Sequence, residues 1–165
     1  MKKIVGLIAL ACVLLLGNAM GQSSHKTKTK ASKEVKDTNY GKVVYLTTDQ
    51  FKKVVYDYTA NSKEWIYTGK LPCVIDFYAD WCRPCRIVGP IMDSLAAEFA
   101  GRVIVYKVNV DKEKELSQVF GISSIPMVLF SPMKGQPASQ PGALTRIQYT
   151  QLVKQICLGE TKGGE

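Results

Sequence analysis

The strongest constraint on the fold is a segment in which a strand-like run leads directly into two closely spaced cysteines. Residues 73–78 form a mostly apolar run of strand length, which is typical of a strand buried on both faces of a sheet. The next residues include Trp81, Cys82, Arg83, Pro84 and Cys85, and helical spacing follows them. Two cysteines separated by two residues at a helix start can close a small disulfide ring. The chain therefore needs a fold that presents a helix N-terminus at the end of a central strand.

This position predicts a reactive thiol at Cys82. Unsatisfied backbone N–H groups and the helix dipole favour negative charge at a helix N-terminus, and Arg83 and Arg86 add positive charge nearby. Each effect lowers the pKa of the Cys82 thiol, and the thiolate is the attacking species. Cys85 lies one turn further into the helix, where we expect it to be less exposed and suited to resolving a mixed disulfide.

Two other interpretations of the cysteine pair have weaker support. A zinc site needs four ligands, but the chain has no second pair with this spacing, and its only histidine, His25, lies in a polar segment. A disulfide across so short a loop removes little entropy from the unfolded chain, which makes it a poor structural cross-link. We therefore expect no metal, and exchange through the two thiols needs no organic cofactor. We also expect Cys73 and Cys157 to be buried, reduced thiols that act as small apolar residues.

Strand and helix patterns alternate around this segment. We expect strands at 43–46, 73–78, 103–110 and 127–130, with a weak edge strand at 136–141. We expect helices at 51–58, 87–99, 112–120 and 145–158; Thr48 would cap the first, Pro90 would interrupt the second, and Ile147, Leu152, Val153 and Ile156 would face the core in the last. The pattern predicts an α/β fold with a mixed central sheet and helices on both faces.

Residues 1–21 have the pattern of a secretory signal peptide. Lys2 and Lys3 precede an apolar run at 4–16, and Ala19 and Gly21 fit the small-x-small cleavage rule. The run is short against the roughly 20 residues of a membrane-spanning helix. Lipid attachment at Cys12 is an alternative, although little apolar sequence precedes it. Export implies an oxidising compartment.

The rest of the chain divides into three parts by composition. Residues 22–39 are rich in Ser, Thr and Lys and nearly free of large apolar side chains, so we expect a disordered tether. Residues 40–159 form the expected folded domain, and 160–165 a flexible tail. The formal net charge of +8 falls partly on the tether, which favours a solvated linker. Without a zinc-finger or RNP-type motif we expect no nucleic-acid partner.

Four segments resemble the motifs of the thioredoxin family. Residues 74–85 resemble its active-site stretch, 107–111 its next strand, 121–127 its cis-proline loop and 142–144 the turn before its last helix. The similarity extends from about residue 40 to residue 158. It implies a thioredoxin-like fold. Together with the expected signal peptide, it predicts an exported, periplasmic or secreted member of the family.

The resemblance also implies the roles of the residues that carry the chemistry. Cys82 would be the nucleophile and Cys85 the resolving thiol. Asp76 would be a buried acid that helps to deprotonate Cys85 through water, with a pKa raised by burial. The alternative interpretation of Asp76 is a core acid paired with Lys107.

A second set of matching residues would bind the substrate. Pro126 would be cis and face the cysteines, which leaves the backbone of Ile125 free to pair with an extended substrate segment. Trp81 and Pro84 complete this set.

The resemblance implies reversible dithiol–disulfide exchange with protein substrates. We expect a monomer, and a reductant outside the cytoplasm would need a membrane electron donor. Pro84 and Ile125 favour reduction, whereas Arg83 stands where the family commonly has Gly, so an oxidase or isomerase of the same fold is an alternative. A non-enzymatic docking module is a second. Residues 59–70 form a longer connection than in the simplest members, and we expect its Trp65 and Tyr67 to cover the edge of the core rather than to shape a partner surface.

Overall fold

A computed structural model of the chain describes residues 40–61 and 63–160. The expected signal peptide and tether, and the tail after residue 160, lie outside the described residues. The described part contains a five-stranded sheet in the order β1-β3-β2-β4-β5. Its strands are β1 Val44–Tyr45, β2 Cys73–Tyr78, β3 Ile104–Asn109, β4 Met127–Ser131 and β5 Ala138–Pro141. β1, β2 and β3 are parallel, and β4 runs antiparallel to both β2 and β5.

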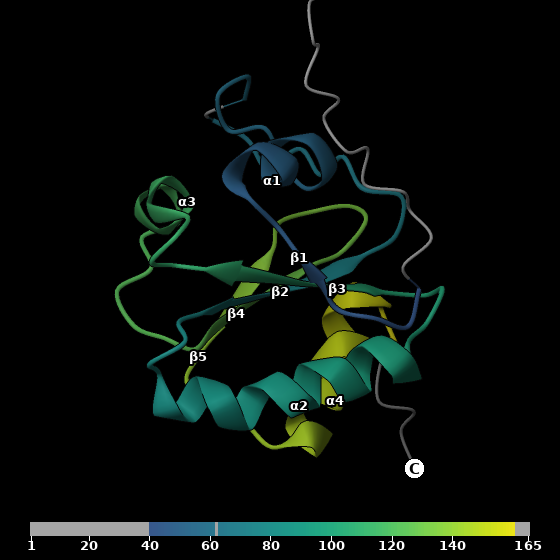
Figure 1. Cartoon of the computed structure of the whole chain (residues 1–165). Helices are drawn as coiled ribbons and strands as arrows, with labels where there is room; N and C mark the ends of the chain where they lie inside the picture. The colour runs from purple at the N-terminus through teal and green to yellow at the C-terminus, as the bar shows by residue number, and fades with distance from the viewer. Residues whose placement is uncertain (1–39, 62, 161–165) are drawn as a thin grey trace, which may run out of the picture. The chain divides into compact units, whose positions relative to one another are not determined.

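Helices cover both faces of this sheet, as the sequence predicts (Figure 1). The helices are α1 Thr48–Val54, α2 Arg83–Glu98, α3 Lys114–Val119 and α4 Arg146–Leu152, and a π-helical turn, η1 Val153–Cys157, continues α4. α1 and α3 lie on one face, and α2 and α4 on the other (Figure 1). None of the described helices is long and apolar enough to cross a membrane.

The central strand β2 separates two apolar cores. Residues 73–77 are all fully buried. Because side chains alternate along a strand, Ile75 and Phe77 enter the core beneath α1 and α3, while Val74 enters the core beneath α2 and α4. Asp76 shares the face of Val74, so this strand carries a carboxylate into an otherwise apolar layer.

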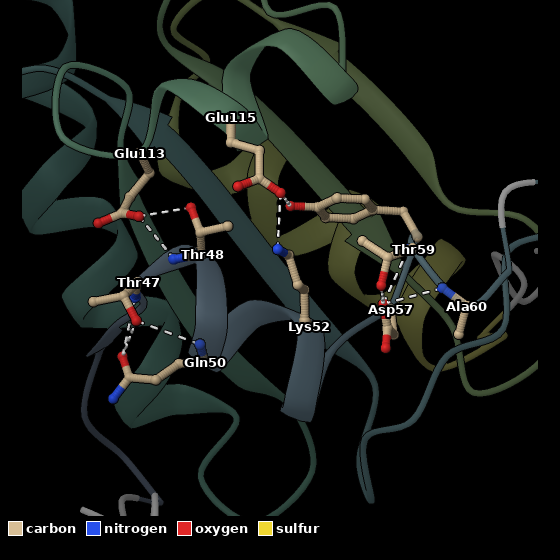
Figure 2. Close-up of polar contacts among 10 residues, drawn as sticks. Thr47, Thr48, Gln50, Lys52, Asp57, Thr59, Ala60, Glu113 and Glu115 are labelled. Atoms are coloured by element: carbon tan, nitrogen blue, oxygen red, sulfur yellow. Dashed lines mark hydrogen bonds and ion pairs between the residues drawn. The ribbon is translucent and has the colours of Figure 1, made fainter. Parts of the chain in front are cut away.

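α1 and α3 are joined by polar contacts between residues far apart in the sequence (Figure 2). The Glu113 carboxylate accepts hydrogen bonds from the backbone N–H and the hydroxyl of Thr48, each at 2.7 Å. Glu115 forms an ion pair with Lys52 at 2.8 Å and accepts the hydroxyl of Tyr58 at 2.6 Å. Burial and the Glu115 carboxylate raise the pKa of Tyr58 to about 12. These contacts hold the two short helices together over one face of the sheet.

The connection at 59–70 packs onto the same face. The Trp65 ring lies 4.6 Å from that of Tyr56 and 6.1 Å from that of Phe120, between ring centroids. Tyr67 also packs against this core, and its hydroxyl donates to the carbonyl of Leu71. The interpretation of this segment as cover for the core edge is therefore confirmed.

The helix bounds differ from the sequence prediction, notably at the end of α1, which stops at Val54 rather than at residue 58, and at the starts of α1 and α2. Thr47, not Thr48, caps α1, because Thr47 and Gln50 form a reciprocal capping box and Thr48 is engaged by Glu113. α2 begins at Arg83 and continues through Pro90, so the expected interruption is wrong. Pro84 lies in the first turn of α2, where a missing N–H has no helical partner to lose.

The placement of Ile147 in the core is also wrong, since its side chain is 71% exposed. Tyr149 and Val153 are fully buried instead, and Leu152 and Ile156 pack against the same core. Residues 149, 152, 153 and 156 share one side of a helix, and residue 147 lies about 200° around the axis from residue 149. The apolar Ile147 therefore lies on the solvent side.

Candidate active site

The two cysteines of the motif form a disulfide at the N-terminus of α2. Cys82 is the N-cap residue, and its sulfur accepts the backbone N–H of Cys85 at 3.2 Å. The sulfur atoms are 2.12 Å apart. Because the first N–H groups of a helix lack helical partners, this position stabilises negative charge on the Cys82 sulfur once the disulfide is reduced.

Neighbouring side chains cover both cysteines. Cys82 and Cys85 are each only 3% exposed, so the expectation that Cys85 is the less exposed of the two is wrong for the oxidised protein. Ala79 packs against the pair, together with the partly buried Val110 and Ile125. The disulfide is therefore almost completely covered in the oxidised protein.

Trp81 and the loop before β4 form the surroundings of the disulfide. Trp81 is 69% exposed, and its indole N–H donates to the Asp111 carboxylate at 2.9 Å. The Ile125–Pro126 peptide bond is cis, and the carbonyl oxygen of Ile125 lies 3.8 Å from the Cys82 sulfur. Ile125 is half-buried and Pro126 is buried. Residues far apart in the sequence thus meet at one sulfur atom.

Strands β2 and β3 place Asp76 beside Lys107. The two residues are register partners, and the Lys107 ammonium lies 3.1 Å from the Asp76 carboxylate, with both side chains nearly inaccessible to solvent. The same ammonium lies 4.5 Å from the centroid of the Tyr78 ring. Burial raises the pKa of Asp76, and Lys107 opposes part of that rise. Asp76 is therefore paired as the alternative interpretation predicts, and its pKa is also shifted in the direction that proton transfer requires.

The other expected site residues lie on the solvent side of α2. Arg83 and Pro84 are exposed in its first turn, and Arg86 is exposed one turn on. The sequence analysis overlooked the contact of Tyr78 with Lys107 and that of Asp111 with Trp81. The position of Asp111 at the end of a predicted parallel strand was an available signal, because such strand ends share one edge of the sheet.

Cys73 and Cys157 are free thiols and both are buried. The Cys157 sulfur lies 3.6 Å from the backbone carbonyl of Cys73. Burial raises the pKa of both thiols, that of Cys157 to about 12. Both should therefore be inert as nucleophiles at neutral pH. Within residues 40–61 and 63–160, no group of three or more His, Cys, Asp or Glu side chains is arranged to hold a metal ion.

A reactive disulfide at a helix N-terminus on a mixed five-stranded sheet defines a thiol–disulfide oxidoreductase. Residues 42–155 match the family model described as thioredoxin, and the chain belongs to the thioredoxin family. A thioredoxin of Borreliella burgdorferi is 38% identical over 113 residues, which cover 68% of this chain and 96% of that protein. A thioredoxin of Haemophilus influenzae is 35% identical over 103 residues, which cover 62% of this chain and 96% of that protein. The M-type chloroplastic thioredoxin of Spinacia oleracea is 30% identical over 125 residues, which cover 76% of this chain and 69% of that protein.

A solved structure of chloroplastic thioredoxin z has the same fold. It superimposes with a TM-score of 0.57 at 26% identity and covers 69% of this chain and 93% of that chain. The family and fold expected from the sequence are therefore confirmed. The chain is a protein-disulfide oxidoreductase whose redox pair is Cys82 and Cys85.

Proposed function

We propose that this oxidoreductase reduces protein disulfides in an extracytoplasmic compartment. The observation that carries the proposal is the position of the Cys82 sulfur. It caps α2, receives the N–H of Cys85, and lies beside the carbonyl of Ile125 at a surface flanked by exposed Trp81.

The proposed reaction has two exchange steps. The Cys82 thiolate attacks one sulfur of the substrate disulfide, and the other substrate sulfur leaves as a thiolate and takes up a proton. The Cys85 thiol loses its proton and attacks the Cys82 sulfur, which releases the second substrate thiol and closes the Cys82–Cys85 disulfide. Two electrons and two protons pass to the substrate. We assign to Asp76 the uptake of the Cys85 proton through water, because its raised pKa lets the carboxyl group hold a proton nearer neutral pH.

The proposed location rests on the N-terminal sequence. The charged, apolar and small-residue order of residues 1–21 is typical of a cleaved signal peptide, and the polar segment 22–39 would tether the domain. Outside the cytoplasm the protein needs a supply of electrons, because the surroundings are oxidising. We therefore propose a membrane-bound dithiol donor that reduces the Cys82–Cys85 disulfide of a monomer.

Insulin reduction with dithiothreitol as electron donor tests the chemistry. The parent protein should accelerate precipitation of the insulin chains, and Cys82→Ser should abolish the acceleration. Cys73→Ala is the matched control, because it removes a buried thiol outside the disulfide. Most of the activity surviving in Cys82→Ser would refute the assigned roles.

The direction and the location need separate measurements. Equilibration with glutathione should give a potential below that of the glutathione pool for a reductase, and a potential above it would favour the oxidase or isomerase. Fractionation of cells that express the full chain should place a product beginning near Gln22 outside the cytoplasm. An uncleaved cytoplasmic product would contradict the proposed location.

A further inference from the structure

The exposed face of the first turns of α2 combines positive charge with apolar surface beside the disulfide. Arg83, Arg86, Ile87 and Pro90 are all exposed. Their spacing of three and four residues places them on one side of the helix. Ile87 is 63% exposed, so this side of the helix presents a large apolar side chain to solvent next to the two arginines. We call these four residues the α2 stripe.

The stability of the helix does not explain the two arginines. Cations at a helix N-terminus oppose the helix dipole, and the first turn of α2 contains no acidic residue. Among the described residues, neither arginine side chain forms an ion pair or a hydrogen bond. Within the described part of the chain, both guanidinium groups are therefore exposed without a fixed partner.

Two acidic groups near Trp81 are held in place by hydrogen bonds. The Asp111 carboxylate accepts the indole N–H of Trp81 at 2.9 Å, and the Asp80 carboxylate accepts the side-chain amide of Asn109 at 3.2 Å. Negative charge is therefore fixed near Trp81, whereas the exposed side of α2 carries positive charge.

We propose that the α2 stripe selects protein disulfides that carry an acidic and an apolar side chain beside the target cysteine. The acidic group would pair with Arg83 or Arg86, and the apolar group would pack on Ile87. This proposal rests on the proposed reductase function and adds the substrate class that the protein prefers. A guanidinium group is suited to this task because it stays charged and binds a carboxylate through two parallel hydrogen bonds.

The test uses three cyclic disulfide peptides. Each has a Leu on one side of one cysteine, and the residue on the other side of that cysteine is Glu, Gln or Lys. We expect the parent protein at low ionic strength to reduce the Glu peptide about fivefold more efficiently than the Lys peptide, as judged by kcat/KM, which is the upper range for an exposed ion pair. Arg86→Glu should abolish or invert the ratio of kcat/KM for the Glu peptide to that for the Lys peptide. Arg83→Glu should have the same effect. Because the ratio compares two substrates of one enzyme, changes in Cys82 reactivity cancel.

Lys134→Glu is the matched control. Lys134 is exposed in the turn after β4. The end of β4 pairs with the start of β2, at Ser131 and Cys73. Because the disulfide follows the other end of β2, this turn lies at the opposite end of the sheet. The substitution changes the net charge equally and should leave the Glu-to-Lys ratio intact. The ratio of the parent should approach one in concentrated salt, because screening weakens exposed pairs.

Each outcome separates the two proposals. An equal kcat/KM for the Glu and Lys peptides in the parent, or an equal change in Lys134→Glu and Arg86→Glu, would overturn the inference. Failure to reduce even the Gln peptide would instead overturn the proposed function. Ile87→Ser should lower kcat/KM for the peptides that carry Leu more than for matching peptides that carry Ser at that position. An equal effect on both sets would refute the role of Ile87 in substrate selection.

Discussion

The buried ion pair of Asp76 and Lys107 should make the stability of the protein depend on pH in a defined direction. The pKa of Asp76 is raised above its ordinary value of 3.8, so the folded protein holds a proton that the unfolded chain releases. The free energy of unfolding should therefore fall as the pH rises from about 3.8 to the folded pKa, at no more than about 1.4 kcal/mol per pH unit for one group. Above the folded pKa this contribution is constant.

Lys107→Met should deepen this dependence. At 3.1 Å, with an effective dielectric constant of about 20, the Coulomb attraction between the two charges is about 5 kcal/mol. Loss of one partner from a buried pair typically costs about 3–5 kcal/mol. Without Lys107 the pKa of Asp76 rises further, so the fall in stability continues to a higher pH. The variant should therefore be about 3 kcal/mol or more less stable than the parent at pH 8, and the difference should be much smaller at pH 4.

Urea unfolding of the oxidised protein, followed by circular dichroism from pH 4 to pH 8, measures this effect. The double variant Asp76→Asn, Lys107→Met removes both charges and is the control. It should recover the stability of the parent at pH 8 or exceed it by up to about 4 kcal/mol. An equal loss in Lys107→Met at pH 4 and pH 8, or a double variant as unstable as the single one at pH 8, would refute the argument.

Three further predictions concern the sulfur chemistry. Cys85→Ser should attack substrates but stall as a mixed disulfide on Cys82, detectable as a covalent adduct by non-reducing electrophoresis; free release of product would contradict the resolving role. Arg83→Gly should raise the pKa of the Cys82 thiol and make the redox potential more negative by less than about 30 mV, because the exposed cation favours the thiolate of the reduced state. Thiol titration and glutathione equilibration, each in low and high salt, measure the two shifts. A shift that does not depend on salt would indicate a backbone effect instead. Alkylation of the folded oxidised protein followed by mass spectrometry should leave Cys73 and Cys157 unmodified until denaturation, and a disulfide between them would refute their assignment as buried thiols.

The features of the site that depend on strand order could be predicted from the sequence. The apolar run at 73–78 predicts a central strand because only a strand covered on both faces tolerates it. The cysteine pair after this strand then lies at a helix start, as found for α2. Lys107 could be named as the partner of Asp76 because the matching segment at 107–111 predicts the neighbouring strand.

Features that depend on helix phase and on side-chain cover could not be predicted in the same way. Thr47 and Thr48 are equally good caps by residue type. Gln50, three residues after Thr47, was an available signal for Thr47, whereas the hydrogen bonds of Thr48 to Glu113, which is distant in the sequence, were not predictable. The equal burial of Cys82 and Cys85 depends on Val110 and Ile125, which reach the pair from other segments.

The site combines several features that oppose folding with contacts that offset them. Cations occupy the N-terminal turns of α2, Trp81 and Ile87 are exposed, and Asp76 lies charged or protonated in an apolar layer. None of these features contributes to packing, yet all lie on α2, directly before it, or on the strand that leads to it. Two apolar cores on either side of β2 supply the compensating burial. The clustering of unfavourable features at one end of a well-packed sheet is what selection for disulfide exchange would retain, because selection for stability alone would remove them.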